Sequence, residues 1–177
     1  MELEVWQIIL IVLGVLLAIY LIIVLTDLMF VLSFHSLLRK HRVALNVLLQ
    51  TKYDNIKVLS DLLKKYDSNY DPKYQEILDS IDIKHLSDLH TKESAKVRLQ
   101  LVYLRDELMY IADKDENFGK NEEFKRAKQH IADLDQIYYA QVATYNADII
   151  GYNYWIRFIP TRYIFNILKI KKKDLIS

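Results

Sequence analysis

The sequence predicts an all-α protein, in which one N-terminal transmembrane helix continues into an antiparallel bundle of about four helices. Three observations lead to this fold. An uncharged apolar run stands near the N-terminus, a 3.6-residue apolar period dominates the rest, and only 3 Gly and 2 Pro interrupt 177 residues. The expected parts are a short N-terminus (1–4), an anchor (5–26), the helical bundle (27–160) and a C-terminal tail (161–177).

The anchor is the 22-residue run from Val5 to Thr26, which carries no charge. At about 1.5 Å per residue it is about 33 Å long, enough to cross the hydrocarbon core of a bilayer. A cleaved signal peptide is the alternative, but the preceding residues are acidic and no Ala-x-Ala cleavage site follows. We therefore expect membrane-embedded positions that include Val5, Trp6, Gly14, Tyr20 and Thr26.

The charges on either side of the anchor predict its orientation. Residues 1–4 hold two acids and no base, whereas Arg39, Lys40 and Arg42 lie within 16 residues of Thr26. The positive-inside rule then places the N-terminus outside and the rest in the cytoplasm. Asp27 follows a run that already spans the bilayer, so it is predicted to lie at the inner headgroups rather than inside the membrane.

Four helical stripes are predicted after the anchor, the first because residues 28–38 stay apolar and continue it. Asp71-Pro72 suits the start of a second helix from about 73 to about 90, Thr91 can cap a third, and the last begins near Asn121. The stripes of the first and third helices comprise Leu45, Leu49, Tyr53, Ile56, Leu59, Leu63 and Tyr66, and then Val97, Leu101, Leu104, Leu108 and Ile111.

The last helix contains a doubled Tyr-Asn in the stretch YNADIIGYNYWIRFIP (145–160). Its apolar positions recur in steps of three and four, which is typical of a core seam. We interpret the two tyrosines as successive packing layers. The two asparagines lie at the shoulder of the seam, where we expect them to hydrogen-bond a neighbouring helix; a ligand site is the alternative. The predicted seam comprises Phe124, Ala127, Ile131, Leu134, Tyr138, Val142, Tyr145, Ile149, Tyr152 and Ile156.

The tail after Pro160 is predicted to be a short amphipathic helix over TRYIFNILKIKKK (161–173). Apolar residues beside clustered bases suit an anionic membrane surface; packing of the same face onto the bundle is the alternative. The basic residues expected at the membrane are Arg162, Lys169, Lys171, Lys172 and Lys173.

Composition excludes several kinds of chemistry. There is no cysteine, which removes disulfides and thiol catalysis, and three scattered glycines build no phosphate-binding loop. Residues 39–177 hold 24 basic and 20 acidic residues, a balance of +4 that is too weak to indicate nucleic-acid binding. No cofactor is expected. The only Asp/Glu-x-x-His pair is Asp82 with His85, a weak match to a di-iron helix motif.

Two blocks of the sequence resemble the LemA family of bacterial membrane proteins. In LQTKYDNIKVLSDLLKKY (49–66) and in the doubled Tyr-Asn stretch, the family motif positions match, although Lys57 stands where the family has proline and Ile159 where it has phenylalanine. The resemblance implies a helical domain on one membrane helix in the bacterial plasma membrane, and it brings no established active site. The matching motif residues include Lys52, Tyr53, Asp54, Ile56, Leu59, Lys64, Tyr66, Tyr145, Asn146, Ile149, Tyr152, Asn153, Ile156 and Pro160.

The sequence as a whole favours a single-pass, non-enzymatic helical protein that presents a surface to the lipid bilayer, to a protein partner or to a second copy of itself. The competing hypothesis is a membrane-tethered bundle that binds a metal or acts as an enzyme through Asp82, His85 and nearby acids. Metal analysis of the purified fragment 39–177 separates the two, because stoichiometric iron, manganese or zinc would favour the second.

Overall fold

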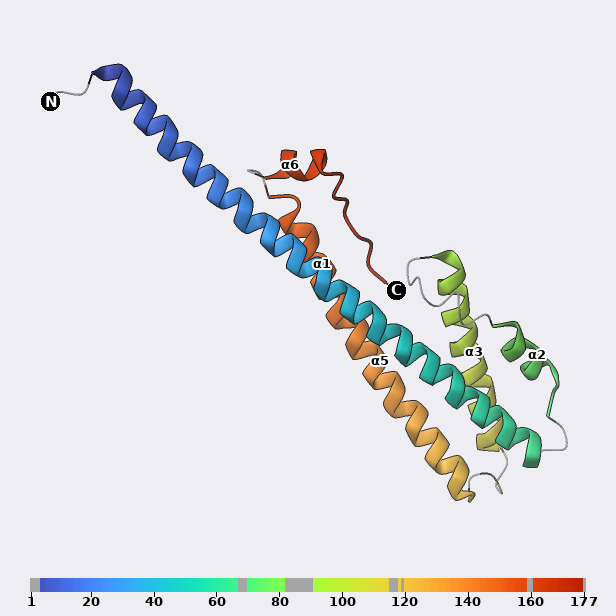
Figure 1. The fold of residues 1–177 in the computed structure, drawn as a ribbon. Coiled ribbons are helices and arrows are strands. Elements are labelled where there is room, and N and C mark those ends of the chain that lie inside the picture. The colour runs from blue at the N-terminus through green and yellow to red at the C-terminus, as the bar shows by residue number, and fades with distance from the viewer. Residues whose placement is uncertain are drawn as a thin grey trace. The chain divides into compact units, whose positions relative to one another are not determined.

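A computed structural model describes residues 4–66, 70–81, 91–114, 118, 120–158 and 161–176, and all regular structure in these ranges is helical. The protein is therefore all-α, as the sequence predicts. The helices are α1 (Val5–Tyr66), α2 (Lys73–Ser80), α3 (Lys92–Lys114), α5 (Glu122–Trp155) and α6 (Arg162–Ile167), and Figure 1 shows them.

The chain folds as two compact units. Unit 1 comprises Met1–Arg39 with Ala147–Leu175, and unit 2 comprises Lys40–Asn146 with Ile176–Ser177. In each unit α1 runs antiparallel to α5. Phe30 stacks on Trp155 and Phe34 faces Gly151 in unit 1, while Lys52 pairs with Asp135 in unit 2. The predicted continuation of the anchor into the helical domain is confirmed, because α1 is one helix of 62 residues.

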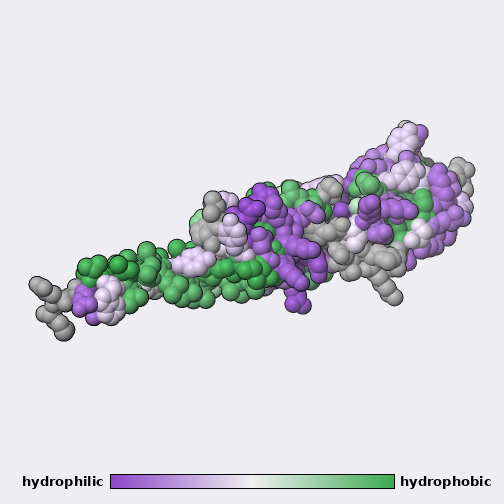
Figure 2. All heavy atoms as spheres, turned by 90° about the horizontal axis from the view of Figure 1, so that it is seen from above, coloured by the Kyte–Doolittle hydropathy of each residue, from purple (hydrophilic) through white to green (hydrophobic). Residues whose placement is uncertain are grey.

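The N-terminal part of α1 is long and apolar enough to cross a membrane. Nearly all of its side chains are exposed along the predicted anchor, for example Leu10 at 58% and Leu17 at 59%. They form most of the green rod at the left of Figure 2. Gly14 has open space around it, and the Thr26 hydroxyl donates to the Ile22 carbonyl of its own helix. That internal bond satisfies the hydroxyl without water.

The core of unit 2 lies between α1, α2, α3 and α5. On α1 the buried positions in unit 2 are Leu45, Leu49, Lys52, Ile56, Leu59, Ser60 and Leu63. All of them except Ser60 recur in steps of four and three. Two assignments of the predicted stripe are wrong: Tyr53 is half-buried and Tyr66 is 48% exposed, because the register passes through Lys52 instead. On α3 the last buried position is Ala112, whereas the predicted Ile111 is half-buried.

The predicted helix starts are confirmed by their hydrogen bonds. The Asp71 carboxylate accepts from the Lys73 N–H at 2.9 Å, the Thr91 hydroxyl from the Ser94 N–H at 3.1 Å, and the Asn121 side chain from the Glu123 N–H at 2.8 Å. Such caps satisfy backbone N–H groups that lack a helical partner. The second helix is shorter than predicted, since α2 ends at Ser80 and Ile81 is extended.

The seam of α5 follows the prediction closely. Eight of its ten positions are buried, and the other two, Ala127 and Val142, are half-buried. Tyr145 and Tyr152 are 2% and 3% exposed, so their rings fill the core as expected. Burial raises the pKa of Tyr152, since an ionised phenol is disfavoured away from water. Pro160, expected to end this helix, lies outside the described residues.

The tail differs from its prediction. Its helix, α6, ends at Ile167, where the N–H groups of Lys169 and Ile170 donate to the carbonyls of Asn166 and Phe165. This is the pattern of a Schellman cap, and Lys169 takes the left-handed conformation that it requires (φ 56°). Residues 171–176 are then non-helical, so the amphipathic helix expected to reach 173 is wrong beyond Ile167.

Candidate membrane-surface site

The start of the tail is fixed to α1 immediately after the anchor. The Thr161 hydroxyl donates a hydrogen bond of 2.8 Å to the Asp27 carboxylate, and the two residues are 0% and 3% exposed. Asp27 is thus a buried polar residue of α1. The sequence predicts for it only a position at the membrane boundary. Because Asp27 directly follows the apolar run, this bond places the first turn of α6 level with the end of that run.

Aromatic packing holds α5 against the same part of α1. The rings of Phe30 and Trp155 stack with centroids 4.7 Å apart. A Cβ atom built on Gly151 would lie 3.0 Å from the Phe34 ring, which is closer than side chains normally approach. The glycine therefore permits the close approach of α5 to the Phe34 ring.

The doubled Tyr-Asn binds the backbone of the tail, and it does so in each unit separately. In unit 1 the Asn153 amide donates to the Lys173 carbonyl at 2.8 Å and accepts from the Lys173 N–H at 2.9 Å, while the Tyr152 hydroxyl donates to the Lys171 carbonyl at 3.0 Å. In unit 2 the Asn146 amide makes the same two bonds to Ile176, at 2.8 and 2.9 Å. Their predicted partner was a neighbouring helix, whereas the actual partner is the tail.

Each asparagine of the doubled motif has both ends of its amide satisfied by the backbone of one tail residue. That residue is Lys173 for Asn153 in unit 1 and Ile176 for Asn146 in unit 2. The motif therefore needs no ligand to explain it.

The outer side of the tail carries both exposed apolar side chains and exposed basic side chains. Tyr163, Ile167 and Leu168 are 74%, 79% and 52% exposed, while Phe165 on the inner side is 2% exposed. Of the predicted membrane-facing bases, Lys173 is half-buried and lies 5.6 Å from the centroid of the Tyr152 ring. The other four are exposed: Arg162, Lys169, Lys171 and Lys172.

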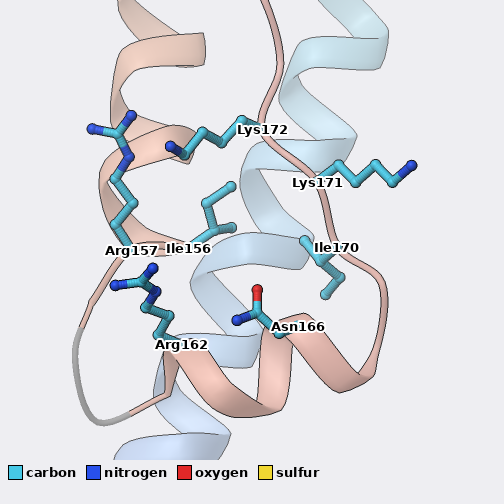
Figure 3. Close-up of a pocket in the computed structure, with 7 residues that line it drawn as sticks. All are labelled: Ile156, Arg157, Arg162, Asn166, Ile170, Lys171 and Lys172. Carbon is cyan, nitrogen blue, oxygen red and sulfur yellow. The ribbon is translucent and has the colours of Figure 1, made fainter.

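A cleft of about 680 Å³ opens in unit 1 between the end of α5, α6 and the tail. Its size is in the range of small-ligand sites. Basic side chains dominate its rim, and two isoleucines line it. The lining residues, drawn in Figure 3, are Ile156, Arg157, Arg162, Asn166, Ile170, Lys171 and Lys172.

A second cluster, buried in unit 2, joins three helices through charge. Lys52 on α1 is 4% exposed and lies 2.5 Å from the Asp135 carboxylate on α5, which also pairs with Arg105 on α3. Lys52 further lies 4.7 Å from the centroid of the Tyr138 ring. Burial lowers the pKa of Arg105, but hydrogen bonds and charge from Asp106 and Asp135 outweigh it and raise the pKa overall. Every charge of this cluster has a partner, so we interpret it as an ion-pair network that stabilises the packing of the three helices.

The remaining predicted residues fall as follows. The Tyr53 hydroxyl donates to the Leu78 carbonyl at 3.3 Å and so links α1 to α2. The Asp54 carboxylate accepts from the Gln50 amide one turn earlier at 3.1 Å, which is a local contact. Arg39, Lys40 and Arg42 are exposed on α1. Within the described ranges, no group of three or more His, Asp or Glu side chains is arranged to hold a metal ion. Asp82 and His85 lie outside those ranges.

No family model matches the chain, and no curated protein or solved structure is similar to it. The resemblance to the LemA family accordingly stays a prediction from the two motif blocks.

Proposed function

We propose that this protein is a single-pass, non-enzymatic membrane protein whose C-terminal tail lies on the inner, anionic surface of the bilayer that its anchor crosses. By the positive-inside rule the N-terminus is outside and the helical domain is cytoplasmic. The LemA resemblance implies the plasma membrane of a bacterium. The observation that carries the proposal is the hydrogen bond between Thr161 and Asp27. It fixes the tail at the level where the apolar run ends.

The composition of the tail supports this position. Exposed Tyr163, Ile167 and Leu168 are costly in water but suit the boundary between headgroups and acyl chains. Each neighbouring base adds about 1 kcal/mol of attraction to an anionic surface. Contact with the bilayer through both the anchor and the tail would hold the first turns of the helical domain at a defined distance from the membrane.

Insertion depth tests the proposal on the full-length protein. The chain has no cysteine, so Ile167→Cys introduces a single site for an environment-sensitive fluorophore. In liposomes that contain anionic lipid, we expect a blue-shifted emission that spin-labelled lipids quench. Val47→Cys on α1, 60% exposed and 20 residues beyond Asp27 on the same helix, is the control and should remain unquenched. Equal quenching at the two positions would reject a tail at the membrane surface.

A protein-contact role is proposed for the helical domain. On α3, Leu99, Tyr103 and Tyr110 are 70%, 46% and 59% exposed, and their spacing places them on one face of the helix. In-cell crosslinking from Tyr103, with identification of the crosslinked chains by mass spectrometry, distinguishes a second copy from a different partner. Absence of any crosslink from this face would remove the proposed contact.

A further inference from the structure

Three of the basic side chains that line the cleft of unit 1 extend to one side of it. In Figure 3 the side chains of Arg157, Arg162 and Lys172 extend to the same side, from the end of α5, from α6 and from the tail. Lys171 extends to the opposite side. An extended chain directs successive side chains to opposite faces, so neighbouring lysines separate in this way.

The three converging bases lack acidic partners among the residues that the structure describes. Some exposed bases elsewhere do have an acidic partner: Lys128 lies 2.6 Å from Asp113 and Lys125 lies 2.9 Å from Glu122. Positive charges that lie near one another without counter-charges repel one another. An anion bound between them would offset this repulsion. Arginine guanidinium groups suit this role, because their N–H groups match the oxygens of a phosphate two at a time.

We propose that Arg157, Arg162 and Lys172 bind a phosphate-bearing group, with the phosphodiester of an anionic lipid headgroup as the membrane source. Asn166 supplies an amide to hydroxyl or phosphate oxygens, and Ile156 and Ile170 pack against the apolar part of the ligand. This inference rests on the proposed position of the tail at the bilayer, because that position brings headgroups to the cleft.

Native mass spectrometry of the full-length protein tests the site. The protein is held in detergent with equimolar phosphatidylglycerol and phosphatidylcholine, and the retained lipid is counted. We expect several-fold preference for phosphatidylglycerol in the wild type. Lys172→Gln should reduce that preference severalfold, and Arg157→Gln/Lys172→Gln should abolish it. Lys171→Gln removes the same charge one residue away and should retain the wild-type preference.

The outcomes separate the possibilities. Equal losses in Lys172→Gln and Lys171→Gln would show diffuse attraction and overturn the site, as would no loss in the double variant. Added inorganic phosphate at millimolar concentration distinguishes the two sources of phosphate: displacement of the lipid identifies a site open to soluble phosphate, and no displacement identifies a headgroup site. Lipid preference without quenching at Ile167→Cys would reject the tail position while leaving the cleft intact.

Discussion

Thr161 and Asp27, 134 residues apart in the chain, form a buried hydrogen bond between the start of the tail and the first polar residue after the apolar run. The bond joins the two segments that we propose to meet at the membrane surface. The local sequence does not predict that either residue is buried. Asp27 is an acidic residue within an apolar stretch, and Thr161 follows a proline.

Thr161→Val is expected to destabilise the full-length protein by about 1–3 kcal/mol, because it leaves the buried Asp27 carboxylate without its partner. Thermal or urea unfolding in detergent measures the loss. Thr144→Val is the matched control: its hydroxyl is exposed and bonds only the Ala140 carbonyl of its own helix. A Thr161→Val protein as stable as the control would show that the bond contributes nothing.

Tyr152→Ala should cost about 3–5 kcal/mol, since it removes a buried ring from the α5 seam. Tyr152→Phe keeps the ring and loses only the bond to the Lys171 carbonyl, about 0.5–1.5 kcal/mol. The neighbouring Tyr154→Ala, at a position 64% exposed, should change little. Tyr145→Ala is expected to behave like Tyr152→Ala. An unchanged melting temperature for Tyr152→Ala would remove the packing role and favour a ligand site.

Asn153→Ala should release the tail, because two hydrogen bonds to Lys173 are lost together. Limited trypsin digestion is the measurement, and we expect faster cleavage at Lys171 to Lys173 with little change in global stability. Asn55→Ala serves as the control, since that amide bonds the Thr51 carbonyl one turn earlier. Identical cleavage rates in the two variants would argue against the clamp.

Asp135→Leu should be strongly destabilising, about 3–5 kcal/mol, because it leaves Lys52 buried without its counter-charge. Adding Lys52→Met should recover much of that loss, since a buried apolar pair needs no compensation. Urea unfolding of the wild type, of Lys52→Met, of Asp135→Leu and of the double variant gives the coupling energy. The exposed pair of Lys128 with Asp113 provides the contrast: Asp113→Asn should cost at most about 1 kcal/mol. Additive effects of Lys52→Met and Asp135→Leu would show that the buried charges are uncoupled.

The proposed topology predicts that protease added to intact cells spares a C-terminal tag. The basic cluster Arg39, Lys40 and Arg42 is the reason, since bases after a span favour the cytoplasmic side. Disruption of the membrane should make the tag sensitive and provides the control. Digestion of the tag in intact cells would show the opposite orientation and contradict the prediction.

Most of the helical architecture could be predicted because helix formation is governed by local signals. Apolar residues every three or four positions, an Asp, Thr or Asn at a helix start, and a scarcity of glycine and proline all act within a few residues. Lys52 was missed in the α1 stripe for a physical reason as well. A lysine is counted as polar, yet its long alkyl stem packs well once Asp135 neutralises its head.

The tail shows where local signals fail. Its sequence has the period of an amphipathic helix, and a helix would pair its own backbone groups. Asn146, Asn153 and Tyr152 offer those groups external partners instead, and a Schellman cap at Lys169 ends the helix after Ile167. The outcome of this competition depends on side chains some twenty to thirty residues away in the chain. The local apolar period of the tail therefore cannot predict it.

The sequence by itself determined the all-α class, an apolar helix long enough for a bilayer, and the buried face of α5, because each depends on composition and period along one stretch of chain. Only the tertiary structure decided the partner of Asp27, the backbone that the paired asparagines bind, and the convergence of Arg157, Arg162 and Lys172 on one cleft. These depend on which distant segments meet, and burial at those meeting points sets the energy of each contact.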